Sequence, residues 1–363
     1  MFEALSSSFS KEIAMIKNSY YLILLTTALP VFSFILIISI FYKGVAFELP
    51  IAIVDNDKSQ LSKKLLFNIE ASPTLKVFSH SFSTKEALSL VKSSKVYAVV
   101  IISPNFQREV LQKKQPKVTA MLNTQYILIG KILTAALVET VAHSAGEVEF
   151  VQNLVNTQNS DTALHIVSPI GLQITPYFNT YKNYFLFLVS ALLPAIWQIF
   201  IVVATIVSFG VLFKNKGEKE YFGTQNITAK IIGKMLPYTI IFTTIGTLFL
   251  FYIYGTLGWY FEGSFAITIF AMFLTVVAYQ VIALVLFVTG FDYARTLSLG
   301  AVYTAPAFAF LGVTFPIYNM NSFALVWRDI LPISHYVELQ ISQVNYGADI
   351  FLEVEKLLTI SAF

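Results

Sequence analysis

Five long runs without Asp, Glu, Lys or Arg divide the chain, and the first is separated from the other four by residues 43–182. A helix needs about 20 apolar residues to cross the hydrocarbon core of a bilayer, so each run is long enough for one membrane span. The interval 43–182 holds most of the charged residues. The predicted spans are 18–42, 183–213, 235–261, 263–291 and 296–327.

The two ends of the chain predict further helices. In residues 1–17, apolar side chains recur every three or four positions, which is typical of an amphipathic helix that lies on the inner leaflet. A partly ordered terminus is the alternative. At the other end, residues from about 351 to 363 resemble the beginning of a sixth span, so we expect a chain truncated within that helix. The apolar positions of the first segment are Phe2, Leu5, Phe9, Ile13 and Ile16.

Residues 43–182 alternate between strand and helix signals, which indicates an α/β domain. Ser83 and Glu86 form a capping box, and Ser103-Pro104 predicts a second helix start. The predicted fold is therefore a polytopic α-helical membrane protein, with one helix before and five after an inserted α/β domain. We expect strands at 49–54, 75–79, 96–102 and 117–123, and helices at 59–70, 84–93, 104–113 and 126–157.

The distribution of Lys and Arg predicts the orientation. With the N-terminus in the cytoplasm, the short inner segments carry eight of these residues and the short outer segments carry only Arg328 and Lys356. Positive charge favours the inner side, whereas long domains cross the membrane largely regardless of charge. We therefore expect an inner-membrane protein with a cytoplasmic N-terminus and residues 43–182 outside, in the periplasm.

Composition argues against a catalytic, metal or cofactor site. The chain is 56% hydrophobic and 12% charged, its net charge is only +3, and it has no Cys. Soluble domains carry about 25% charged residues. Nucleic-acid binding, disulfides and thiol catalysis are therefore not expected. Asp55-x-Asp57 resembles a calcium loop, but Gln60 and Leu66 replace the Gly and Glu that such a loop requires, so a turn with a helix cap is favoured.

The predicted spans contain no ionisable side chain, which argues against an ion-driven carrier. The chain also lacks a phosphate-binding loop of the Gly-x-x-x-x-Gly-Lys-Ser/Thr type, so ATP would have to act on another subunit. Large polar, aromatic and proline residues within the spans are candidates for a pathway or a hinge, although ordinary membrane-helix prolines would give the same pattern. These candidates are Pro194, Trp197, Gln198, Gln280, Pro306 and Phe308.

Four stretches, taken in order, resemble a known family. Ile53 to Ser62 contains a Val-Asp-x-Asp-x-Ser opening, and Ser103 to Phe106 follows a strong strand. Residues 220–238 combine a Gly-Thr turn with Gly-Lys-Met-Leu-Pro-Tyr, and Pro332 to Tyr336 reads Pro-Ile-Ser-His-Tyr. The chain resembles the permease subunit of the type 2 ATP-binding-cassette (ABC) family, in the exporter branch with a large external domain after the first helix.

This resemblance implies a dimer, formed with a second copy or a paralogue, and an ABC ATPase subunit that carries ATP and Mg²⁺. A lipophilic or amphipathic drug or lipid would leave outward, and a periplasmic adaptor could dock on the external domain. The loop between the second and third spans would contact the ATPase, although it is shorter than usual for the family. A non-transporting receptor or assembly factor is the alternative function. The implied coupling residues are Lys216, Glu218, Lys219, Glu220, Gly223 and Thr224.

Overall fold

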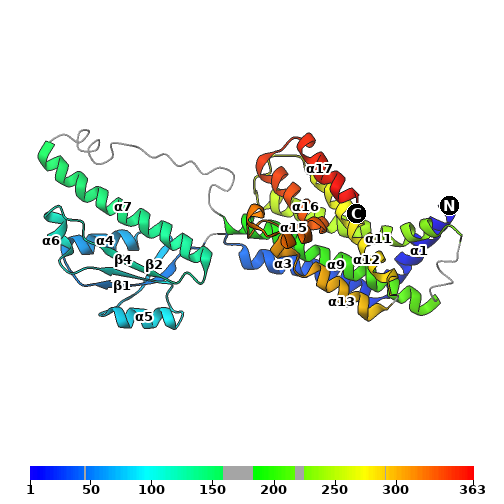
Figure 1. The fold of residues 1–363 in the computed structure, drawn as a ribbon, viewed down its shortest axis with the longest axis horizontal. Helices are drawn as coiled ribbons and strands as arrows, with labels where there is room; N and C mark the ends of the chain where they lie inside the picture. Colours follow the sequence, from blue (N-terminus) through cyan, green and yellow to red (C-terminus); the bar gives the residue numbers. More distant parts are fainter. Residues whose placement is uncertain (45, 158–182, 217–224, 291) are drawn as a thin grey trace. The chain divides into compact units, whose positions relative to one another are not determined.

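A computed structural model describes residues 1–44, 46–157, 183–216, 225–290 and 292–363 (Figure 1). The chain forms two compact units. One contains Met1–Gly44 and Pro176–Phe363, and the other contains Val45–Thr175. The first unit is helical, and the second contains a small sheet. Each unit is described separately below.

The second unit is an α/β domain, as the alternation of strands and helices predicted. Strands β1 (Leu49–Asp55), β2 (Leu75–His80), β3 (Ala98–Ile102) and β4 (Val118–Leu122) form a sheet in the order β2-β1-β3-β4. Strand β1 is parallel to β2 and β3, and β4 is antiparallel to β3. The helices are α4 (Gln60–Glu70), α5 (Thr84–Lys92), α6 (Phe106–Leu111) and α7 (Ile127–Thr157).

The buried strand residues alternate between two faces of this sheet, because successive side chains of a strand point to opposite sides. Ile51 and Ile53 pack with residues of α4 and α7, whereas Ala52 and Val54 pack with residues of α5. The sheet is thus covered on both faces. This explains why its central strands read as continuous apolar runs.

The helix starts of this unit show where local prediction holds. Ser83 Oγ accepts the backbone N–H of Glu86, as expected of a capping residue. The predicted cap at Ser103 is wrong, because α6 begins at Phe106 after a left-handed Asn105. The Asp57 carboxylate accepts the backbone N–H of Gln107 at 3.0 Å and so caps α6 from a distant part of the chain.

The Asp55-x-Asp57 stretch forms a turn and a helix cap, as predicted. Asp55 accepts the backbone N–H groups of Asp57 and Lys58 and the hydroxyl of Ser62. Burial opposes ionisation of Asp57, but hydrogen bonds from the Ser59 side chain and from the backbone of residues 105–107 outweigh it and lower the pKa of this carboxyl. Among the described residues, no group of His, Asp and Glu could hold a metal ion.

The first unit begins with α1 (Phe2–Asn18) and then an apolar stretch made of α2 (Tyr20–Ile23), a π-turn (Leu24–Ala28) and α3 (Leu29–Phe41). The long helices that follow are α9 (Tyr184–Lys216), α11 (Ile227–Leu250) with a π-turn (Phe251–Thr256), and α12 (Phe265–Val288). The shorter elements are α13 (Tyr293–Thr304), α14 (Ala307–Phe310), a 3₁₀ turn (Ile317–Asn319), α15 (Ser322–Asp329), α16 (Pro332–Ile341), a π-turn (Ser342–Tyr346) and α17 (Ile350–Ser361).

The residues of the first unit before and after the inserted α/β domain lie next to each other. Gly44 O accepts the backbone N–H of Tyr184, so the chain leaves and re-enters this unit at neighbouring residues. Gly44 has a φ of +64°, and a Cβ there would lie 2.5 Å from the amide of Asn183. Only glycine suits both the left-handed backbone and this close approach.

Five helices of the described part are long and apolar enough to cross a membrane, judged by length and composition alone. Four of them correspond to the first four predicted spans. The fifth is Ile127–Leu154 of α7, which sequence analysis assigned to the α/β domain. Residues 296–327 do not form one helix, because the chain breaks at Pro306 and has no α-helix between Leu311 and Asn321.

The segment after α14 instead forms a helical hairpin of α15 and α16, and α16 lies beside α12. Near the middle of α12, the Tyr279 hydroxyl accepts the backbone N–H of Ile333, at the start of α16. At the first residue before α12, Ser264 N–H donates to Gln343 Oε1, ten residues further along the hairpin. The turn between α15 and α16 therefore lies at the level of the middle of α12 rather than beyond its end.

Candidate coupling cluster and apolar pocket

A buried ion pair joins α1 to α11. Glu12 is 4% exposed and Lys234 is 3% exposed, and Lys234 Nζ lies 2.6 Å from Glu12 Oε2. The other carboxylate oxygen accepts the hydroxyls of Ser208 at 2.5 Å and Tyr238 at 2.7 Å. One carboxylate therefore links three helices, namely α1, α9 and α11. We call Glu12, Ser208, Lys234 and Tyr238 the Glu12 cluster.

Small residues bring α1 close enough to α11 for this pair to form. A Cβ at Gly233 would collide with the carbonyl oxygen of Leu5, so the two helix backbones touch there. One turn away, Ser8 Oγ donates to Lys230 O at 2.7 Å. The Lys234 ammonium also lies 5.4 Å from the centre of the Phe209 ring, at a distance that suits a cation–π contact.

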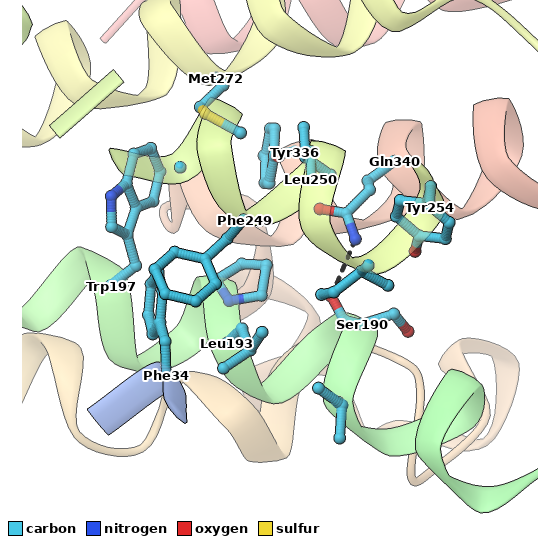
Figure 2. Close-up of a pocket in the computed structure, with 14 residues that line it drawn as sticks. Phe34, Ser190, Leu193, Trp197, Phe249, Leu250, Tyr254, Met272, Tyr336 and Gln340 are labelled. Carbon is cyan, nitrogen blue, oxygen red and sulfur yellow. Dashed lines mark hydrogen bonds between the residues drawn. The ribbon is translucent and has the colours of Figure 1, made fainter. Parts of the chain in front are cut away.

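A second feature of the first unit is a pocket between α3, α9, the α11 segment and α16 (Figure 2). Its cavity volume is about 40 Å³, and nearly all of its surface is apolar. Of the residues predicted for a pathway, Pro194 and Trp197 line it. The other lining residues are Phe34, Val189, Ser190, Leu193, Gly246, Phe249, Leu250, Ile253, Tyr254, Met272, Tyr336 and Gln340.

Pro194 determines the polar contact in this pocket. A proline inside a helix has no N–H, so the carbonyl four residues earlier, that of Ser190, loses its helical donor. Gln340 Nε2 of α16 donates to Ser190 O at 2.9 Å and replaces that bond (Figure 2). The break in α9 is thus satisfied by the neighbouring hairpin, as membrane-helix prolines require.

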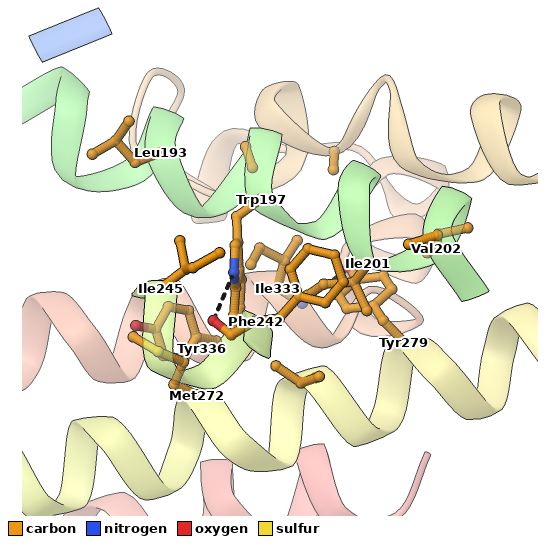
Figure 3. Close-up of a cluster of buried hydrophobic side chains, with 14 of the residues drawn as sticks. Leu193, Trp197, Ile201, Val202, Phe242, Ile245, Met272, Tyr279, Ile333 and Tyr336 are labelled. Carbon is orange, nitrogen blue, oxygen red and sulfur yellow. Dashed lines mark hydrogen bonds between the residues drawn. The ribbon is translucent and has the colours of Figure 1, made fainter. Parts of the chain in front are cut away.

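Trp197 connects the pocket with the main apolar core. Its Nε1–H donates to Phe242 O at 3.3 Å, and its ring packs beside Tyr336 (Figure 3). Trp197 is 2% exposed. It therefore fixes α9 against both α11 and α16, and any ligand in the pocket would contact a side chain that is held on both sides.

The other predicted pathway residues lie outside the pocket. Gln198 Nε2 donates to Thr304 O at the end of α13, just before Pro306 interrupts the helix, and Phe308 is half-buried in the following turn. Gln280 Oε1 accepts the Thr239 hydroxyl at 2.8 Å, and its amide donates to Met235 O at 3.1 Å. These two glutamines cross-link helices and are not among the residues that line this pocket.

Most of the predicted coupling residues fall outside the described part of the chain. Glu218, Lys219, Glu220, Gly223 and Thr224 lie within residues 217–224, which the structure does not describe. Lys216 is the last residue of α9, and its side chain is not described either.

The sequence model of the family described as "ABC-2 family transporter protein" matches residues 21–358. The chain belongs to the ABC-2 transporter family. No curated protein and no solved structure matches it significantly. The resemblance to an ABC-2 permease is thereby confirmed. Members of this family are the membrane subunits of transporters and are not themselves catalytic, and the family implies an ABC ATPase as partner.

Two of the stretches that carry the resemblance to ABC-2 permeases lie at the features described above. Gly233 to Tyr238 supplies the close approach to α1 and two members of the Glu12 cluster. Pro332 to Tyr336 begins α16 beside Tyr279 and Trp197.

Sequence reasoning missed Glu12, although a signal was present. Glu12 lies directly beside the apolar stripe, three residues after Phe9 and four before Ile16, so its carboxylate is on the same side of α1 as the stripe. A carboxylate at such a position requires a buried partner. Lys234, which directly precedes the third uncharged run, was counted only as a positive residue that sets orientation.

Proposed function

We propose that this ABC-2 chain is the membrane subunit of an ATP-driven exporter that moves a lipophilic or amphipathic substrate, such as a drug or lipid, outward from the inner membrane or cytoplasm. Membership of the ABC-2 family supports transport. The apolar lining at Pro194 and Trp197 supports a lipophilic substrate, because it offers very few polar groups to a ligand; the helices would have to separate to admit one, since the space between them is about 40 Å³.

The observation that carries the proposal is the Glu12 cluster. Coupling requires that a movement at the ATPase reach the membrane helices. Glu12 binds Ser208 of α9 and Lys234 of α11, the two helices that flank residues 217–224 in the sequence. A displacement of α1 or of this loop would therefore pull on both helices through buried, charge-assisted bonds.

In this mechanism the ATPase binds at the cytoplasmic side, against α1 and residues 214–234. Lys216, Glu218, Lys219 and Glu220 would pair with charges on its surface, and Gly223 and Thr224 would form the turn between them. Closure of the ATPase around ATP and Mg²⁺ shifts α9 and α11 of two permease copies. The α/β domain, on the outer side, caps the exit or docks an adaptor.

Reconstitution of the chain with its ATPase in proteoliposomes tests the proposal. Glu218→Lys with Glu220→Lys should leave basal ATP hydrolysis in place but abolish its stimulation by substrate, and should abolish outward transport. The reason is that two lysines would then face the positive charges of the ATPase with which the two glutamates are proposed to pair. Glu109→Lys with Glu139→Lys, both in the α/β domain, changes the net charge equally and serves as the control. Wild-type transport by the first double variant, with normal ATPase binding, would refute the coupling role.

A further inference from the structure

The helix α7 is much longer than the strands that it covers. Its first half packs on the sheet through Leu133, Ala136 and Leu137, which belong to the core of the α/β domain. The same face continues for three more turns. Its residues Val141, Ser144, Ala145, Val148, Glu149 and Gln152 recur at helical spacing and line a cavity instead.

This cavity lies wholly within the α/β domain. Leu61 and Leu65 of α4 form one wall, and Phe106 and Val110 of α6 form another, facing the α7 residues. The cavity volume is about 590 Å³. Typical ligand pockets measure about 300–1,000 Å³, so a ligand with an acyl chain and a headgroup would fit.

Polar contacts hold α7 in place over the cavity. Asn68 Nδ2 of α4 donates to Ser144 Oγ at 2.9 Å and to Glu147 Oε2 at 3.1 Å. Lys64 Nζ lies 3.1 Å from the same carboxylate. The cavity is therefore a built feature between two tethered helices, and the charge of Lys64 is already paired.

The remaining charges at the cavity favour an anion. Lys113 and Lys114, which follow α6, are exposed and have no ion pair among the described residues. Among the described lining residues, one carboxylate, that of Glu149 on α7, opposes these lysines. Lys117 adds a further positive charge nearby in the sequence. An acyl chain would cover the apolar wall, and its acidic headgroup would lie between the two lysines.

We propose that the α/β domain binds an amphiphile with one hydrocarbon chain and an anionic headgroup between α4, α6 and α7. Val141, Ala145 and Val148 of α7 would contact its hydrocarbon chain. The proposal does not depend on the export function, since every residue that it uses belongs to the α/β domain.

Photo-crosslinking of the full-length chain in lipid nanodiscs tests this site. The probe is a palmitic acid that carries a diazirine on its chain, and the matched neutral probe is the corresponding alcohol. Peptide mass spectrometry measures labelling of residues 106–118 and 141–152 relative to labelling of α12. This ratio corrects for partition of the probe into the bilayer.

Val148→Trp should reduce the labelling ratio at least about tenfold by filling the cavity, whereas Val151→Trp, which lies outside the lining stripe and is 53% exposed, should leave it unchanged. Lys113→Glu with Lys114→Glu should lower labelling by the acid about three- to tenfold, as expected for two exposed charge contacts. Labelling by the alcohol should not change.

The equal-charge control is Lys85→Glu with Lys92→Glu on α5, which covers the other face of the sheet. Labelling confined to α9, α11 and α12 would overturn the site. Equal labelling of the Val148→Trp and Val151→Trp chains would also overturn it. A loss of labelling by the alcohol equal to that of the acid would overturn the anionic headgroup.

Discussion

The Glu12 cluster makes a quantitative prediction about stability. We consider the cycle of Glu12→Gln, Lys234→Met and the double variant. At the 2.6 Å separation of Nζ and Oε2, the direct attraction is about 6 kcal/mol for an effective dielectric constant of about 20. Desolvation of both groups offsets much of this attraction, so the pair contributes little net stability, but loss of one partner leaves a buried charge.

The two single variants should each lower the free energy of unfolding by about 3–5 kcal/mol. In Glu12→Gln, the buried ammonium keeps only a neutral amide oxygen and the Phe209 ring. In Lys234→Met, the carboxylate keeps the hydroxyls of Ser208 and Tyr238 but loses its counter-charge. The double variant should lie within about 1 kcal/mol of the wild type, because the amide still accepts both hydroxyls and no charge is buried.

Thermal unfolding in nanodiscs, followed by fluorescence of the three tryptophans, measures this cycle. A loss of 3–5 kcal/mol corresponds to a midpoint lower by about 6–20 °C for a unit of this size. Glu3→Gln and Lys17→Met change exposed residues of the same helix and should stay within about 0.5 kcal/mol of the wild type. If the two single losses simply add in the double variant, the charges do not interact and the cluster is not the link that we describe.

Two further variants test local contacts. Gln340→Leu should destabilise the chain by about 1–3 kcal/mol, because Ser190 O loses its donor. Adding Pro194→Ala should restore most of this loss, because the alanine supplies a helical N–H to Ser190 O. Thermal unfolding of the wild type, the two single variants and the double variant measures both effects. Asp57→Asn should lower the unfolding midpoint at pH 7. Because the pKa of Asp57 is lower in the folded chain than in the unfolded chain, the difference between variant and wild type should shrink as the pH falls through about 3.8 and below. A constant difference from pH 7 to pH 3 would contradict the role of the ionised cap.

Prediction from the sequence succeeded where local pattern and burial agree. The strands around Ile51 and Val100 were found because both faces of the sheet are covered, so their residues are continuously apolar. Ser83 was found because its partner lies three residues away. The start of α6 was missed because its cap, Asp57, comes from another part of the chain, which no local rule can detect.

The two failures in the helical unit have different causes. Residues 296–327 were read as one span because they lack charge, yet absence of charge does not make a helix. Pro306 removes a donor, and Gly312 has a φ of +81°, so the chain bends there and returns beside α12. Glu12 was missed because its partner, Lys234, is more than 200 residues away in the sequence. Lys234 itself was interpreted only as a positive charge that sets the orientation in the membrane.

Neutral glutamines satisfy three free carbonyls of the helical unit. Gln340 donates to Ser190 O before Pro194, Gln198 donates to Thr304 O at the end of α13, and Gln343 donates to Ala348 O in the turn before α17. An amide satisfies such a carbonyl without the desolvation cost of an ion. Breaks of this kind can open and close at the expense of one hydrogen bond, about 1 kcal/mol net.

Ion pairs also join helices in the same unit. Glu12 and Lys234 are both buried and pair between α1 and α11, whereas Arg328 pairs with the partly exposed Glu338 across the turn of the α15–α16 hairpin. Breaking the fully buried Glu12–Lys234 pair costs several kcal/mol, so this contact moves as a rigid joint. We therefore expect conformational change to occur at the glutamine-satisfied breaks in α9 and α13, while the Glu12–Lys234 joint transmits it.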